Sequence, residues 1–242
     1  MATLDRVIEA IKSNRVKKPK KDIVHVPESD LIEIIETAMH SFAAEPMLLK
    51  LTAPFYVISD VHGQLFDLLR HFKNNGYPPS SRYLILGDIV DRGDHSIESI
   101  ILLFALKLRY PDKVYITRVQ PLERNSQQSV WLLRRMHKKV QCEALETIHR
   151  LFQLRRYRLK SMESFWRAMA GYRDLQKLSQ IDEIVRPLEI PDTGIMCDIL
   201  WSDPKKFNIE DDPGSGVFKR WGANDRGTSW VFGENLNITD LN

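Results

Sequence analysis

Four polar side chains, in two short motifs of this 242-residue chain, could do chemistry together. Asp60 and His62 stand in Asp-Val-His-Gly, and Asp88 and Asp91 stand in Gly-Asp-Ile-Val-Asp-Arg-Gly. Carboxylates supply hard oxygen ligands and imidazole suits iron, zinc and manganese, so Asp60, His62 and Asp88 predict a divalent-metal site. An aspartate after a strand is often only a helix cap, and a lone histidine is often only a surface residue. The spacing of the two motifs follows no capping pattern and favours the metal site.

Each motif directly follows a short apolar run, at residues 55–58 and 83–86. Runs of β-branched and aromatic residues that close in Asp and Gly predict buried strands. Between them, apolar residues at helical spacing predict a helix that starts near Leu65 and stops at Gly76. A second helix is predicted after a Ser96 cap, and a third strand at 113–118. The pattern is therefore strand–helix–strand–helix–strand.

Parallel strands end at one edge of a sheet, and ligands bind at that edge. We therefore expect Asp60, Asp88 and Arg118 to lie together, with the two carboxylates less than about 8 Å apart, as one shared ion requires. Upstream, apolar periodicity predicts helices over 3–13 and, after a Ser29 cap, to about residue 40.

The two motifs and two later stretches resemble the serine/threonine phosphoprotein phosphatases, which are calcineurin-like metallophosphoesterases. The later stretches are Pro-Asp-Thr-Gly-Ile-Met-Cys-Asp-Ile-Leu-Trp-Ser-Asp-Pro at 191–204 and Trp-Gly-Ala-Asn-Asp-Arg-Gly-Thr-Ser-Trp-Val-Phe-Gly at 221–233. Type-1 protein phosphatases are the nearest members. The resemblance covers most of residues 1–118 and 174–233 and leaves the middle of the chain unmatched.

The resemblance implies a mixed α/β fold, a β-sandwich with flanking helices, which is incomplete here. Residues 1–50 would form a helical N-terminal subdomain and residues 51–242 the metallophosphoesterase domain. The family hydrolyses phosphoserine and phosphothreonine esters with two metal ions, manganese, iron or zinc, which an aspartate bridges. In this chain that aspartate is Asp88.

The resemblance also assigns Asp91 a catalytic role and makes Arg92 and Arg226 the catalytic arginines that bind phosphate. A guanidinium suits this role because its planar fork donates two hydrogen bonds to a phosphate. Two structural salt bridges are the alternative interpretation.

The sequence departs from the family directly after Arg118, where the family has Gly-Asn-His-Glu and this chain has Val-Gln-Pro-Leu-Glu. In the family that asparagine binds the second metal and that histidine protonates the leaving alkoxide. Gln120 is one methylene longer than asparagine, and Pro121 has no proton to give. The second-metal ligands and the general acid are thus not identifiable, and the sequence supports at most one metal ion.

The chain also ends before the family's last metal-binding histidine and its closing strands. An incomplete sheet would expose an unpaired edge and apolar surface, so we expect a chain that aggregates or depends on a partner.

Residues 119–173 are predicted to be an atypical basic helical insert or replacement. From 122 to 170 there is no Gly or Pro, and eleven Lys and Arg stand against four Asp and Glu. A solvated helix face, or poorly ordered chain, is the plain interpretation. RNA binding is the alternative, because aromatic residues alternate with the charge. The basic run at 15–21 is interpreted as a solvated linker, with a nuclear-localisation signal as the alternative.

The remaining composition is that of an ordinary globular protein, with 43% hydrophobic and 28% charged residues. No apolar run is long enough to span a membrane, so no membrane partner is expected. Two distant cysteines, Cys142 and Cys197, indicate a reducing compartment, so we expect the cytoplasm, the nucleus or both. Expected partners are a phosphoprotein substrate or a regulatory subunit, and nucleic acid is not expected.

Three hypotheses about function stay open at this point. The chain is a working phosphatase with substitute ligands, a catalytically dead relative (a pseudophosphatase) that binds phosphoproteins or regulatory subunits, or a degenerate product without a stable fold. Metal stoichiometry and a phosphatase assay separate the first two hypotheses, and an unfolding midpoint tests the third.

Overall fold

The computed structural model describes residues 2–13, 26–90, 92–117, 158–159, 179–185, 191–204, 221–225 and 227–232. Its contacts divide the chain into two compact units. The first unit comprises residues 1–45 and 53–156, and the second comprises residues 46–52 and 157–242. The subdomain boundary near residue 50 and the extent of the insert at 119–173 stay predictions.

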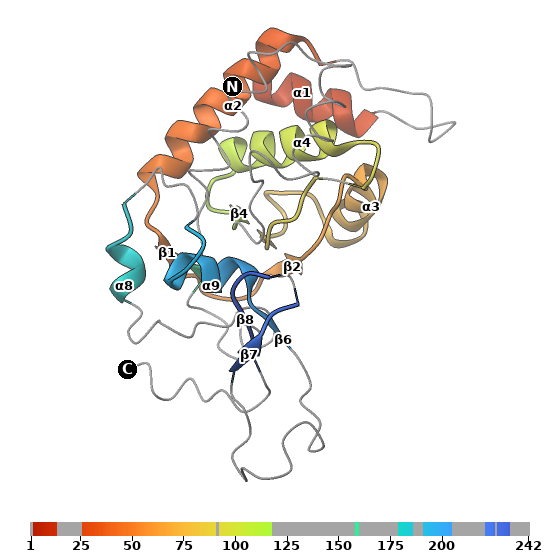
Figure 1. The fold of residues 1–242 in the computed structure, drawn as a ribbon. Coiled ribbons are helices and arrows are strands. Elements are labelled where there is room, and N and C mark those ends of the chain that lie inside the picture. The colour runs from red at the N-terminus through yellow and green to blue at the C-terminus, as the bar shows by residue number, and fades with distance from the viewer. Residues whose placement is uncertain are drawn as a thin grey trace, which may run out of the picture. The chain divides into compact units, whose positions relative to one another are not determined.

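The first unit contains a parallel three-stranded sheet. Strands β2 (Tyr56–Ile58), β3 (Tyr83–Ile85) and β4 (Val114–Ile116) lie in the order β2-β3-β4, and β3 is buried along its length. Helices α3 (Leu65–Asn75) and α4 (Ser96–Arg109) connect them (Figure 1). The predicted alternation of strands and helices is therefore confirmed for the first half of the chain.

Each connecting helix has the burial that its sequence requires. Leu65, Leu68 and Phe72 of α3 are buried, which matches their helical spacing. The helix stops at Gly76, whose φ of +88° is a conformation that glycine adopts without steric cost. Helix α4 is buried from residue 98 to residue 107, consistent with its almost continuous apolar sequence.

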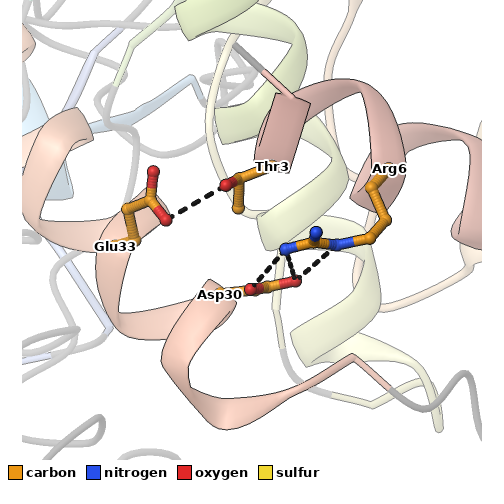
Figure 2. A network of polar contacts seen from close by, with 4 residues as sticks. All are labelled: Thr3, Arg6, Asp30 and Glu33. Atoms are coloured by element: carbon orange, nitrogen blue, oxygen red, sulfur yellow. Dashed lines mark hydrogen bonds and ion pairs between the residues drawn. The ribbon is translucent and has the colours of Figure 1, made fainter.

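Two N-terminal helices also belong to the first unit. Helix α1 (Ala2–Ser13) buries Val7, Ile8 and Ile11, and both α1 and α2 (Glu28–Ala44) pack on α4. Polar contacts also join α1 to α2. Figure 2 shows Arg6 donating hydrogen bonds to both carboxylate oxygens of Asp30, and Thr3 donating to Glu33.

Both predicted serine caps are wrong. Helix α2 starts at Glu28 after Pro27, and α4 starts at Ser96 after His95, and neither has a side-chain cap hydrogen bond. The hydroxyl of Ser96 instead donates to the carbonyl oxygen of Gly93 at 3.4 Å. Loop packing overrides the local capping preference in α4. Helix α2 also runs four residues beyond the predicted end near residue 40.

Within its described residues, the second unit holds two small sheets. Strand β1 (Leu48–Leu49) pairs in parallel with β5 (Arg158–Leu159), so these two residues of the predicted helical insert form a strand instead. These two residues form a strand because they pair with β1, a contact that the local sequence does not encode. Strands β6 (Asp203–Pro204), β8 (Trp230–Phe232) and β7 (Trp221–Ala223) form the other sheet, in that order.

Helices α8 (Ser179–Asp182) and α9 (Ile195–Trp201) also belong to the second unit. Polar side chains tie α9 to the segment around β7 and β8. The amide of Asn224 donates to the carbonyl oxygen of Trp201 at 2.9 Å, and Ser229 donates to Asp198 at 2.9 Å. Cys197 is a buried free thiol, and burial raises its pKa. Across the described ranges, no helix has the length and apolar character that a membrane span requires.

Candidate metal centre

Three predicted metal ligands meet at the carboxyl edge of the parallel sheet. Asp60 follows β2, Asp88 follows β3, and His62 follows Asp60 by two residues. The Nε2 atom of His62 lies 3.3 Å from Oδ2 of Asp88 and 3.9 Å from Oδ2 of Asp60. One ligand atom from each residue can be chosen so that all three lie within 4.8 Å of one another. The expected approach of the two carboxylates is confirmed.

The imidazole of His62 is oriented by the main chain. Its Nδ1 atom lies 3.0 Å from the carbonyl oxygen of Val90. A carbonyl oxygen only accepts hydrogen bonds, so Nδ1 must donate, and in the neutral ring Nε2 keeps its lone pair. This orientation directs Nε2 toward both carboxylates. A backbone acceptor behind a ligating histidine is a common feature of metal sites in proteins.

The two aspartates occupy different environments. The Asp60 side chain is 54% exposed, and its Oδ1 accepts a hydrogen bond of 2.7 Å from Ser59. The Asp88 side chain is only 11% exposed. The main-chain oxygen of Asp88 accepts hydrogen bonds from the amides of Val61 and His62, each at 3.0 Å. These bonds join the loop after β2 to the loop after β3 next to the ligands.

Positive backbone angles concentrate at this site. His62, Asp88 and Arg92 have φ values of 45°, 36° and 57°. Residues with a Cβ rarely adopt such values, although Asp and His tolerate them better than most, and each costs about 1–3 kcal/mol. Such conformations persist only where the surroundings fix them, and they cluster at active sites. The strain therefore supports a functional role for these two loops.

The triad fits a divalent metal ion. Oxygen and imidazole nitrogen ligands lie about 2.0–2.2 Å from zinc, so two ligands of one ion are at most about 4.4 Å apart. The two distances from His62 Nε2 satisfy this limit, and all three ligand atoms lie within 4.8 Å of one another. The donor set of two carboxylates and one imidazole suits manganese, iron or zinc.

The other predicted site residues are placed less fully. Asp91, Arg118 and Arg226 lie outside the described residues, so their predicted positions and roles stay predictions. Arg92 is described, with an exposed side chain near the end of the Asp88 motif. Its role in phosphate binding also stays a prediction.

Sequence reasoning missed three features of the site. The carbonyl of Val90 carries no sequence signal, because any residue supplies the same acceptor. For the hydrogen bond from Ser59 to Asp60, the sequence shows only that a polar residue precedes the ligand. The close packing of Gly93 on the loop after β2 had a signal, since glycine permits backbone contacts that other residues prevent.

Two comparisons with known proteins agree with this geometry. Residues 53–118, which span β2 to β4, match the calcineurin-like phosphoesterase family. The fold is similar to that of a protein serine/threonine phosphatase from Saccharomyces cerevisiae with similarity to human phosphatase PP5. The TM-score is 0.70 at 24% sequence identity, over 86% of this chain and 65% of the yeast chain.

Together the two comparisons define the fold of the protein. Residues 53–118 match the calcineurin-like phosphoesterase family, and the fold is a metallophosphoesterase fold of mixed α/β type. The chain spans 65% of the length of the yeast phosphatase that it resembles in fold. Special closeness to type-1 phosphatases stays a prediction.

Proposed function

We propose that this chain is a metal-dependent phosphomonoesterase of the serine/threonine protein phosphatase type, with one divalent metal ion held by Asp60, His62 and Asp88. The convergence of these three side chains carries the proposal, because the three potential ligand atoms lie within 4.8 Å of one another. The calcineurin-like match over the same residues supports it. Phosphoproteins are the proposed substrates, by analogy with the phosphatase whose fold is similar.

Each residue has a distinct task in this proposal. Asp60 and Asp88 supply oxygen ligands, and the neutral imidazole of His62 supplies nitrogen. A divalent ion, when bound, would offset phosphate charge and acidify a water. Arg92 is exposed at the end of the same loop and would donate hydrogen bonds to phosphate oxygens.

The leaving group decides which esters the site can hydrolyse. Positioned proton transfer typically contributes about 10²–10⁴-fold to a rate. The segment after Arg118 has Pro121 where the family has its protonating histidine, and proline offers no proton. An aryl phosphate leaves as a stabilised phenolate without protonation, whereas a serine alkoxide does not. We therefore expect residual activity toward aryl phosphates and negligible hydrolysis of phosphoserine.

The test uses the full chain with Mn²⁺ and two substrates, p-nitrophenyl phosphate and a phosphoserine peptide. We expect Mn²⁺-dependent hydrolysis of the aryl ester only, and loss of that activity in Asp88→Asn, which removes one charged ligand. Phosphoserine turnover near ordinary enzyme rates, about 1–10³ s⁻¹, that Asp88→Asn abolishes would show that substitute groups complete the site. Aryl phosphate hydrolysis that survives Asp88→Asn would place the activity elsewhere.

A second candidate function is phosphoprotein binding without turnover. The replacement of the Gly-Asn-His-Glu motif by Val119-Gln120-Pro121-Leu122-Glu123 favours it, since catalytic groups are lost while Arg92 and Arg226 remain. Under this hypothesis the phosphoserine peptide binds in calorimetry, is not hydrolysed, and is displaced by inorganic phosphate. A peptide without the phosphate serves as the control.

A further inference from the structure

Two glycines bring the metal-binding loops into backbone contact. A Cβ atom on Gly93 would overlap the carbonyl oxygen of His62 and lie 2.7 Å from the carbonyl of Gly63. A Cβ on Gly63 would lie 2.6 Å from Oγ of Ser96 and 3.0 Å from the carbonyl oxygen of Gly93. Distances below 3.0 Å are not found for real Cβ atoms, so an alanine at either position must move something.

Hydrogen bonds cross this contact in both directions. The amide of Gly93 donates to the carbonyl oxygen of His62 at 2.8 Å. The amide of His95, directly before α4, donates to the carbonyl oxygen of Gly63 at 3.2 Å, and the amide of Gly63 donates to Ile89 at 2.8 Å. The loop that carries His62 is thus held between the Asp88 loop and the start of α4.

We infer that Gly93 and Gly63 are positioning residues for the metal site, acting through the backbone of His62. The amide of Gly93 fixes the main-chain carbonyl of His62, so Gly93 acts through the backbone of a ligand residue. That carbonyl belongs to a residue with a φ of 45°, a conformation that needs external support. The two glycines allow the approach that keeps the imidazole against Asp88. This inference rests on the proposed metal site, although its first test needs no metal.

Gly93→Ala is the most direct variant. Gly93 itself has no positive φ, so alanine there adds the steric overlap without a conformational penalty. The overlapping atom is main chain, which no side-chain rotation relieves. Gly76→Ala is the matched control, because it combines a φ of +88° with a Cβ 2.9 Å from Ser81 Oγ, away from the metal ligands. It destabilises the same unit without touching either loop.

The first measurement is amide hydrogen exchange of the metal-free protein by NMR. In Gly93→Ala we expect the amides of Val61, His62 and Gly63 to exchange at least about tenfold faster, because their loop opens locally. The amides of Leu86 and Thr117, which donate to Ile58 and Ile85 across the sheet, should keep their wild-type rates. In Gly76→Ala, the ratio of the loop exchange rates to the exchange rates of these sheet amides should stay as in wild type.

The second measurement is the Kd for Mn²⁺ by calorimetry. We expect Gly93→Ala to raise it by about 10- to 100-fold, the range typical of residues behind metal ligands, and Gly76→Ala to leave it unchanged. Failure of wild type to bind Mn²⁺ would overturn the proposed function. The amide hydrogen-exchange measurement alone would then decide whether the glycines are positioning residues. Wild-type exchange rates at the three loop amides in Gly93→Ala would overturn the inference.

A second pair of variants guards against misfolding of Gly93→Ala. Gly63→Ala should also speed exchange at the loop, and adding Ser96→Ala should restore part of the protection, because it removes the nearest atom. Loop amides that exchange as slowly in Gly63→Ala as in wild type would contradict the positioning role.

Discussion

At the scale of single residues, one side chain decides whether the edge of the sheet can bind a metal. His62 lies between the two carboxylates, and its ring is fixed by the carbonyl of Val90. Asp60 and Asp88 each place a carboxylate near the same imidazole nitrogen, and two such carboxylates suit a divalent cation. The histidine nitrogen completes a set that favours a transition metal over calcium.

The first residue-scale prediction concerns His62→Asn. Asparagine tolerates the left-handed backbone of this position, so the change removes Nε2 while the loop keeps its conformation. We expect the Kd for Mn²⁺ to rise by more than about 100-fold, beyond the range of outer-shell losses. Calorimetry measures the effect, with His71→Asn, an exposed position on α3, as the matched control. Equal loss in both variants would argue against a ligand role.

At the scale of elements, the site depends on how helices are joined around the sheet. Helix α4 is the buried centre of the first unit, and its first turn supports the loop that carries His62. Helices α1 and α2 pack on α4. The ring of Phe42 in α2 packs edge-on against that of Phe104, with 5.7 Å between the ring centroids. The N-terminal helices therefore stabilise the element behind the site without contributing a ligand to the triad.

The element-scale prediction concerns the link between α1 and α2. Arg6 contacts both oxygens of Asp30, whose side chain is only 8% exposed (Figure 2). Arg6→Ala leaves that carboxylate without its main charged partner, so we expect a loss of about 1–2 kcal/mol in the free energy of unfolding. Arg70→Ala, in an exposed i,i+3 pair with Asp67, should cost less than about 0.5 kcal/mol. Urea unfolding measures the free energy of unfolding of both variants. Equal losses would contradict a larger stabilising role for the Arg6–Asp30 pair.

At the scale of the whole molecule, stability depends on a buried cation. Lys107 of α4 is 1% exposed and forms a 2.8 Å ion pair with Glu45, and it also donates to the carbonyl oxygen of Pro111 at 2.9 Å. Burial lowers the pKa of Lys107 to about 8, and the nearby Asp112 carboxylate opposes that shift. Burial outweighs the neighbouring charges, so the charged lysine costs stability at neutral pH.

The sign of the pH dependence follows from this pKa. In the unfolded chain a lysine has a pKa near 10.5, so between pH 8 and 10 the unfolded state binds more protons. The free energy of unfolding should therefore rise by about 2 kcal/mol over this range. Above pH 10 it should fall again, because burial raises the pKa of Tyr83 to about 12 and the folded state keeps that proton.

Lys107→Met tests the whole-molecule prediction. Methionine has a similar length and no charge, so the rise between pH 8 and 10 should disappear in the variant. Chemical unfolding at several pH values measures it, with Lys73→Met on α3, whose side chain is exposed, as the control. A wild type whose stability stays level from pH 8 to 10 would contradict the prediction. The expected tendency to aggregate remains a prediction at this scale.

The amino-acid sequence by itself determined the local elements and the ligand set. Apolar runs and helical periodicity located β2, α3, β3, α4 and β4 to within a few residues, because burial imposes those periods on the sequence. The motif spacing named Asp60, His62 and Asp88, since both motifs follow strands whose ends share an edge.

Only the tertiary structure decided how those ligands are held. The Val90 carbonyl behind His62 and the approach of Gly93 to the His62 carbonyl are contacts between loops that lie about thirty residues apart. The strand at Arg158–Leu159 likewise depends on a partner distant in sequence, the strand at Leu48–Leu49. Local propensity is a weak term beside such packing, which is why sequence patterns alone missed these features.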